Sequence, residues 1–176
     1  SDDGVIESVV EVGNAITNTG WGLQTQRRPV EQTTGAFGFD PVIREPNDLR
    51  RHRYPEIGHD AAESARRLER AQDLLGDIVP VRLQGVRRFA ANLMSLYTGW
   101  RGLHEVMQDM CERPAMLHEA MAFLEEGHWR MLRQYEALSL LALNNDGTYH
   151  SSGGNGYTDE LPAPGFSADR VRPRVK

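Results

Sequence analysis

Residues 138–160 read LSLLALNNDGTYHSSGGNGYTDE, and this stretch decides the predicted fold. It opens with an apolar run of the length of one buried strand. The run stops at two amides and a carboxylate, Asn144, Asn145 and Asp146, and continues into a glycine-rich loop. In parallel sheets and in (β/α)8 barrels, ligands bind beyond the carboxyl ends of the strands. The stretch therefore predicts a parallel strand that brings polar side chains to a binding site.

The segment before this strand contains an earlier helix and strand. Asp60 and Glu63 form a capping box, which predicts a helix that runs to Gly76 and buries its apolar stripe. Residues 77–86 are apolar and β-branched, and this composition predicts a strand. A helix followed by a strand is the repeating unit of a parallel sheet.

Three further helices are predicted between the two strands. Residues 89–97 and 103–111 have helical patterns, which Thr98 and Gly99 separate, and Pro114 begins a longer helix that leads directly into the strand of the opening stretch. The order of helix, strand, helices, helix and strand is typical of an α/β protein with a parallel sheet. The predicted fold class is therefore α/β.

The first part of the chain is predicted to lie outside these β/α units. Residues 5–18 carry apolar side chains at near-helical spacing, which predicts an amphipathic helix, and glycines and prolines divide residues 21–43 into short stretches typical of a hairpin. Pro46 is placed to begin a one-turn helix in a connector that Pro55 ends. The predicted organisation is a helix and hairpin excursion over 1–44, two β/α units over 45–150, and a Gly/Pro-rich loop and tail over 151–176.

Composition excludes several classes of protein. The chain has 176 residues, 39% of them hydrophobic and 26% charged, which is typical of one globular domain. We expect a cytoplasmic protein, because the sequence has no apolar run long enough for a membrane span and no secretory signal. The net charge of −5 opposes binding to a nucleic-acid backbone. The single cysteine, Cys111, excludes an internal disulfide and is predicted to be buried and inert.

Catalytic candidates follow the strand of the opening stretch. Tyr149 and His150 have the chemistry of a general acid and base, with Asp146 as a proton acceptor. Asn144 and Asn145 are predicted to orient a polar substrate. The structural alternatives are that the tyrosine and histidine bond to loop backbone, and that the amides and the carboxylate cap an element and close a turn.

Substrate-binding candidates lie after the other predicted strand and in the glycine-rich loop. Arg87 and Arg88 can clamp carboxylates through two hydrogen bonds, although two adjacent residues of a helix cannot both face one cleft. Tyr157 is assigned to the same group. No metal site is predicted, since Glu125 and His128 have a di-iron spacing without a usable second pair, and His128 is interpreted as a residue at the edge of the core.

The chain resembles the uroporphyrinogen decarboxylase superfamily, which includes the cobalamin-dependent methyltransferases. The resemblance covers residues 40–150 and includes the connector Glu45-Pro46-Asn47-Asp48-Leu49, the strand that ends at Gly85, and the helix that begins at Arg113-Pro114. Residues 143–149 and 156–166 look like signatures of one branch of the superfamily, and membership of that branch does not name a substrate.

The resemblance implies part of a (β/α)8 barrel of the uroporphyrinogen decarboxylase type. It implies a lyase that decarboxylates a tetrapyrrole-like or small carboxylated substrate, or a methyltransferase linked to a corrinoid, with residues 86–89 facing the active-site cleft. The position of the family's cleft tyrosine falls near Leu93, and its arginine-rich loop has no counterpart in residues 1–35.

The resemblance also implies that the chain is a fragment. The histidine and cysteines that hold zinc in the methyltransferases belong to the second half of the barrel, so zinc and a corrinoid are expected only in a longer protein. Either a second copy of the chain or the remainder of the barrel is expected to cover the open sheet edges. The alternative function is a non-catalytic binding or assembly module that retains the scaffold without the catalytic residues.

Overall fold

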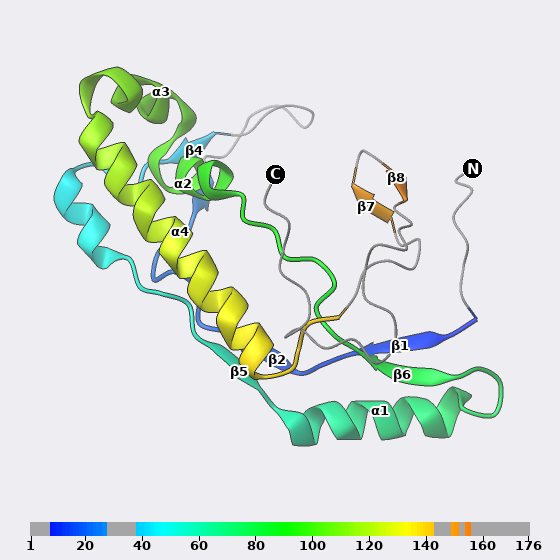
Figure 1. Ribbon diagram of the computed structural model, residues 1–176. Coiled ribbons are helices and arrows are strands. Elements are labelled where there is room, and N and C mark those ends of the chain that lie inside the picture. Colours follow the sequence, from blue (N-terminus) through cyan, green and yellow to red (C-terminus); the bar gives the residue numbers. More distant parts are fainter. Residues whose placement is uncertain (1–7, 28–37, 143–148, 152–153, 156–176) are drawn as a thin grey trace, which may run out of the picture.

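A computed structural model describes residues 8–27, 38–142, 149–151 and 154–155 of the chain (Figure 1). The protein is a mixed α/β structure, as the sequence predicts. Strands and one helix form one end of the molecule, and a group of helices forms the other end (Figure 1).

Three extended segments form a parallel ladder in the order in which they occur in the chain. β1 (Val10–Gly13) pairs in parallel with β6 (Val81–Gln84), and beyond the end of β6, Val86 bridges in parallel to Leu141. The Val86 amide donates to the Leu140 carbonyl at 2.6 Å, and the Ala142 amide donates to the Val86 carbonyl at 3.1 Å. The strand predicted to begin at Leu138 is not formed in its described part, where residues 138–139 make a turn and Leu141 makes one isolated parallel bridge. β6 confirms the other predicted strand, and β1 adds a further parallel segment.

The helix predicted over residues 5–18 is wrong for its described part. Residues 10–13 form β1, and Ile16–Asn18 form β2, which pairs antiparallel with β5 (Ile57–His59). The apolar residues of this stretch fit the spacing of a helix and also the two-residue repeat of a strand, because Val10 and Val12 are spaced by two. Their β-branched side chains favour extended backbone, and pairing with β6, which lies far away in sequence, decides the outcome.

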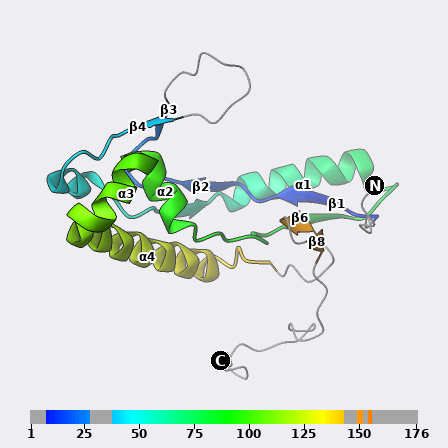
Figure 2. The ribbon, with the colours of Figure 1, turned by 90° about the horizontal axis from the view of Figure 1, so that it is seen from above.

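α1 (Ala61–Leu75) begins at the predicted capping residue and lies along β1 and β6 (Figure 2). The Asp60 carboxylate accepts a hydrogen bond from the Glu63 amide at 2.8 Å, which confirms the cap. The predicted burial of the apolar stripe is wrong, because Ser64 is the only buried residue of α1, and Leu68 and Ala71 are half-buried. Leu74 is 66% exposed, and Ile78, in the turn after the helix, is 72% exposed.

The helical end of the molecule consists of η1 (Pro46–Arg51), α2 (Leu93–Arg101), α3 (Leu103–Glu112) and α4 (Pro114–Ala137). The predicted break at Thr98-Gly99 is wrong, because α2 continues to Arg101 and the chain turns at Gly102, where φ is +92°. Glycine adopts this backbone angle without the steric penalty of a side chain. Cys111 lies on the outer face of α3 and is exposed, contrary to the prediction.

Two apolar cores hold the molecule together, and α4 contributes to both. The larger core lies at the helical end and includes Ile43, Tyr97, Trp100, Val106 and Leu124. The smaller core lies near the sheet and contains Ile57, Tyr135 and Leu140.

Two short antiparallel pairs complete the described structure. β3 (Gln26–Arg27) pairs with β4 (Phe39–Asp40), in agreement with the predicted hairpin, and β7 (Tyr149–Ser151) pairs with β8 (Gly154–Asn155). None of the helices in the described part of the chain has the length and apolar character needed to cross a membrane.

Candidate functional site

The parallel ladder carries a cluster of charged side chains on β1, on β6 and just after β6. Glu11 of β1 and Arg82 of β6 are in register, and an oxygen of the Glu11 carboxylate lies 2.7 Å from Nη2 of Arg82. The same oxygen contacts Nη2 of Arg87, which follows β6. Glu11 and Arg87 have side chains that are only 19% and 17% exposed. Arg87 follows the carboxyl end of β6, where ligands bind in parallel sheets, and its guanidinium group is held by the carboxylate of Glu11, the second residue of β1.

The two predicted arginines have different environments. Arg87 is half-buried and paired with Glu11, whereas Arg88 is exposed. Residues 87–92 are not helical, so the expectation for adjacent residues of a helix does not apply to this pair. Sequence reasoning missed two members of this edge. Glu11 was assigned to a helix, and Asn14, whose side-chain amide donates to the Gln84 carbonyl at 2.9 Å, gave no signal of its own.

The other predicted site residues are placed only in part. Asn144, Asn145, Asp146 and Tyr157 lie outside the described residues. The backbone of Tyr149 and His150 belongs to β7 rather than to an open loop, and their side chains lie outside the description. Their proximity to Arg87 therefore stays a prediction.

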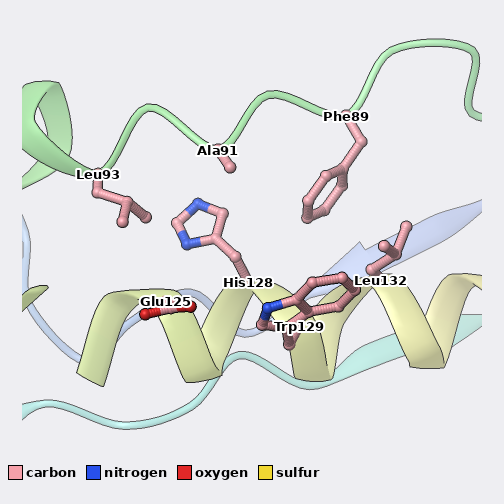
Figure 3. A pocket seen from close by; sticks show the side chains of 7 residues that line it. All are labelled: Phe89, Ala91, Leu93, Glu125, His128, Trp129 and Leu132. Atoms are coloured by element: carbon pink, nitrogen blue, oxygen red, sulfur yellow. The ribbon is translucent and has the colours of Figure 1, made fainter. Parts of the chain in front are cut away.

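A cavity of about 300 Å³ lies between α4 and the segment that follows β6 (Figure 3). Its lining is almost entirely apolar and consists of Phe89, Ala91, Leu93, Glu125, His128, Trp129 and Leu132. The four α4 residues occupy positions i, i+3, i+4 and i+7, so they share one face of the helix. The opposite wall belongs to residues 86–93, part of which the family resemblance predicts to face a cleft.

His128 is held in one orientation at the edge of this cavity. Its Nδ1 lies 2.7 Å from the Leu124 carbonyl, which can only accept, so Nδ1 carries a proton and donates. In the neutral ring, Nε2 is then an acceptor. The ring packs between Trp21 and Phe89, with centroid distances of 5.0 and 6.0 Å. The structure half-buries His128 at the core edge, as predicted, and adds an acceptor beside an apolar cavity.

Two adjacent carboxylates near this cavity differ in their partners. Glu126 pairs with Arg130 on the same helix, with an N–O distance of 2.7 Å. Glu125 lines the cavity, is exposed, and has no cationic partner in the described part of the chain. Glu125 contributes to the wall of the cavity, and the lining remains almost entirely apolar.

A buried ion pair supports the helical end without belonging to either site. Nε and Nη2 of Arg101 donate to the two carboxylate oxygens of Asp109 at 2.7 and 2.9 Å. Nη1 of Arg101 donates to the carbonyls of Ile43 and Arg44, both at 3.2 Å. The hydrogen bonds that Arg101 donates to the Asp109 carboxylate raise the pKa of the Arg101 guanidinium. Burial raises the pKa of nearby Tyr97 to about 12, so this phenol is neutral at physiological pH.

Comparison of the chain with known protein families, with curated proteins and with solved structures finds no match. Among residues 8–27, 38–142 and the two short β7 and β8 segments, no three His, Cys, Asp or Glu side chains are grouped to hold a metal ion.

Proposed function

We propose that this chain forms part of a (β/α)8 barrel of the uroporphyrinogen decarboxylase type. The observation that carries the proposal is the parallel ladder, in which β1, β6 and residues 140–142 are neighbours in chain order. A barrel of this kind adds each new parallel strand beside the previous one, through a helical crossover. α1 supplies the crossover before β6, and α2, α3 and α4 supply the next one.

The proposed substrate is a carboxylated organic molecule, either tetrapyrrole-like or smaller. Arg87 supports this class of substrate, because a guanidinium group binds carboxylates through paired hydrogen bonds. The guanidinium group of Arg87 already contacts one carboxylate, that of Glu11. The proposed reaction is decarboxylation, or methyl transfer with a corrinoid that would supply the methyl group. In either case Arg87 binds and orients the substrate.

A non-catalytic assembly module is the second candidate. It is favoured by the apolar side chains left exposed on the parallel sheet, Leu83 and Leu141, and by the exposed end of α1. Neighbouring exposed apolar side chains on a sheet and a helix indicate a surface that another chain segment covers.

Titration with uroporphyrin, a tetrapyrrole with several carboxylates, tests the proposal through the emission of the porphyrin. We expect saturable binding by the wild-type protein and about tenfold weaker binding by Arg87→Gln, since a charged hydrogen-bonded pair contributes about 1.5–3 kcal/mol. Arg88→Gln is the matched control and should change the affinity by less than about twofold.

Two outcomes contradict the proposal. The first is the absence of saturable binding, and the second is an equal loss in the two arginine variants. If the protein instead forms a stable oligomer in sedimentation experiments and binds no porphyrin, the assembly module is the better account. Circular dichroism of each variant shows whether its fold is intact.

A further inference from the structure

The cavity beside α4 offers an occupant almost no polar contact. Its lining is almost entirely apolar, with Phe89 and Leu93 on one wall and Leu132 on the other. His128 also lines the cavity, but its Nδ1 is bonded to the Leu124 carbonyl of its own helix. A charged or polar group that moves from water into such surroundings loses hydrogen bonds that the lining does not replace. The cavity therefore disfavours ions of either sign and favours an uncharged, apolar occupant.

The size and the aromatic walls of the cavity favour a single ring. The volume of about 300 Å³ lies at the lower end of the range for small-molecule sites. Phe89 and Trp129 line the cavity from opposite walls, and aromatic rings that pack on one another gain more than the burial of their area alone. Trp129 is 52% exposed, so an occupant would remove apolar surface from water.

We propose that the cavity between α4 and residues 89–93 binds a small, uncharged aromatic molecule. The ring of the ligand packs between Phe89 and Leu132 and against the exposed side of Trp129 (Figure 3). Burial of apolar surface drives the binding, and no ion pair takes part in it. The assignment does not rest on the carboxylate-binding role of Arg87, so either proposal can fail without the other.

NMR titration with three probes that share one ring tests this assignment. Toluene is uncharged, benzylamine carries an ammonium group at neutral pH, and benzoate carries a carboxylate. We expect toluene to shift the indole N–H signal of Trp129 saturably, with a dissociation constant of about 0.1–1 mM. Both ions should bind at least about tenfold more weakly, because each must give up its hydration. The absence of saturable toluene binding overturns the proposal, as does an ion that binds as tightly as toluene.

A pair of adjacent alanines provides variants that locate the site. The side chain of Ala91 points into the cavity, whereas Ala90 is exposed and does not line it (Figure 3). Ala91→Leu fills part of the cavity and should weaken toluene binding by at least about tenfold. Ala90→Leu makes the same change outside the cavity, and its affinity should stay within about twofold of the wild type. Equal affinities in the two variants overturn the proposal.

Circular dichroism of the two leucine variants shows whether each retains the fold. The comparison of the three probes uses the wild-type protein alone, so it decides the proposal even if a variant does not fold. In that comparison, a cavity that selects by charge would bind one of the two ions more tightly than toluene. A cavity that selects an uncharged ligand rejects both ions.

Discussion

At the scale of single residues, His52 is a partly buried side chain whose environment disfavours its charged form. Its ring packs on Trp100 and Phe123, with centroids 4.9 and 5.1 Å away. Nδ1 lies 2.8 Å from the Leu49 carbonyl, and the buried Nε2 has no hydrogen-bond partner in the described structure. Burial lowers the pKa of His52 below its ordinary value, and this effect outweighs the hydrogen bond to Leu49, which raises the pKa.

The lowered pKa of His52 predicts that the protein loses stability in mild acid. Between the folded pKa and the ordinary value of about 6.5, the unfolded chain binds a proton that the folded chain does not bind. The contribution to the free energy of unfolding is therefore complete above about pH 6.5 and declines as the pH falls below it. Urea unfolding at pH 7.5 and at pH 5.5 measures this decline.

Substitution identifies the residue responsible for this decline. His52→Phe preserves an aromatic ring in the core and cannot titrate, so its free energy of unfolding should change less between the two pH values than that of the wild type. His104 is exposed on α3, and His104→Gln should retain the full decline. A decline of equal size in the wild type and in His52→Phe would show that other groups cause the pH dependence.

Among the secondary-structure elements, β6 and residues 140–142 approach each other unusually closely at Gly85. A Cβ atom on Gly85 would lie 2.7 Å from the Leu140 carbonyl oxygen and 2.9 Å from the Cβ atom of Ala142. Both distances are too short, and one neighbour is backbone, so the strands would have to separate. The absence of a side chain at Gly85 is therefore a condition for the parallel bridge.

Gly85→Ala should lower the free energy of unfolding by about 1–3 kcal/mol, the usual effect of overpacking. Gly13→Ala is the control in the neighbouring strand, because a Cβ atom there has no atom within 4 Å. The free energy of unfolding of this control should lie within about 0.5 kcal/mol of the wild-type value. Chemical denaturation of the three proteins measures both effects, and equal stability of the two variants would contradict the close approach.

Local signals in the sequence predicted the elements that depend on local contacts. Asp60 begins α1, Pro46 begins η1 and Pro114 begins α4 at the predicted positions, because caps and proline act within one turn. The sequence did not predict β1, whose partner lies far along the chain, or the exposure of α1, which depends on what packs against it. The same limit applies to the site. Arg87 was found next to a strand end, but its partner Glu11 belongs to the strand that was missed.

For the molecule as a whole, α4 connects the two cores, and this predicts that they unfold together. Asp109→Asn leaves the Arg101 guanidinium without its charged partner in the buried helical end, where Asp109 is 1% exposed. We expect Asp109→Asn to lower the free energy of unfolding by about 3–5 kcal/mol, the usual effect of breaking a buried ion pair. Because α4 packs in both cores, hydrogen exchange should accelerate at the Val86 and Ala142 amides of the sheet as well as in α3.

The control for this prediction is Glu126→Gln, which breaks an exposed pair on α4. Such pairs contribute less than about 1 kcal/mol, so exchange in the sheet should change little. If Asp109→Asn accelerates exchange in α3 and leaves Val86 and Ala142 protected, the two ends of the molecule unfold independently.

The pairing of β1 with β6 also has a consequence for synthesis of the protein. Glu11 and Arg82 face each other across the ladder but are 71 positions apart in sequence. β1 therefore leaves the ribosome well before its partner strand exists, and at about 5–20 residues per second it waits for several seconds. During that time an apolar, β-branched segment has no native partner. A nascent chain stopped before β6 should consequently be a target for chaperones that bind extended apolar segments.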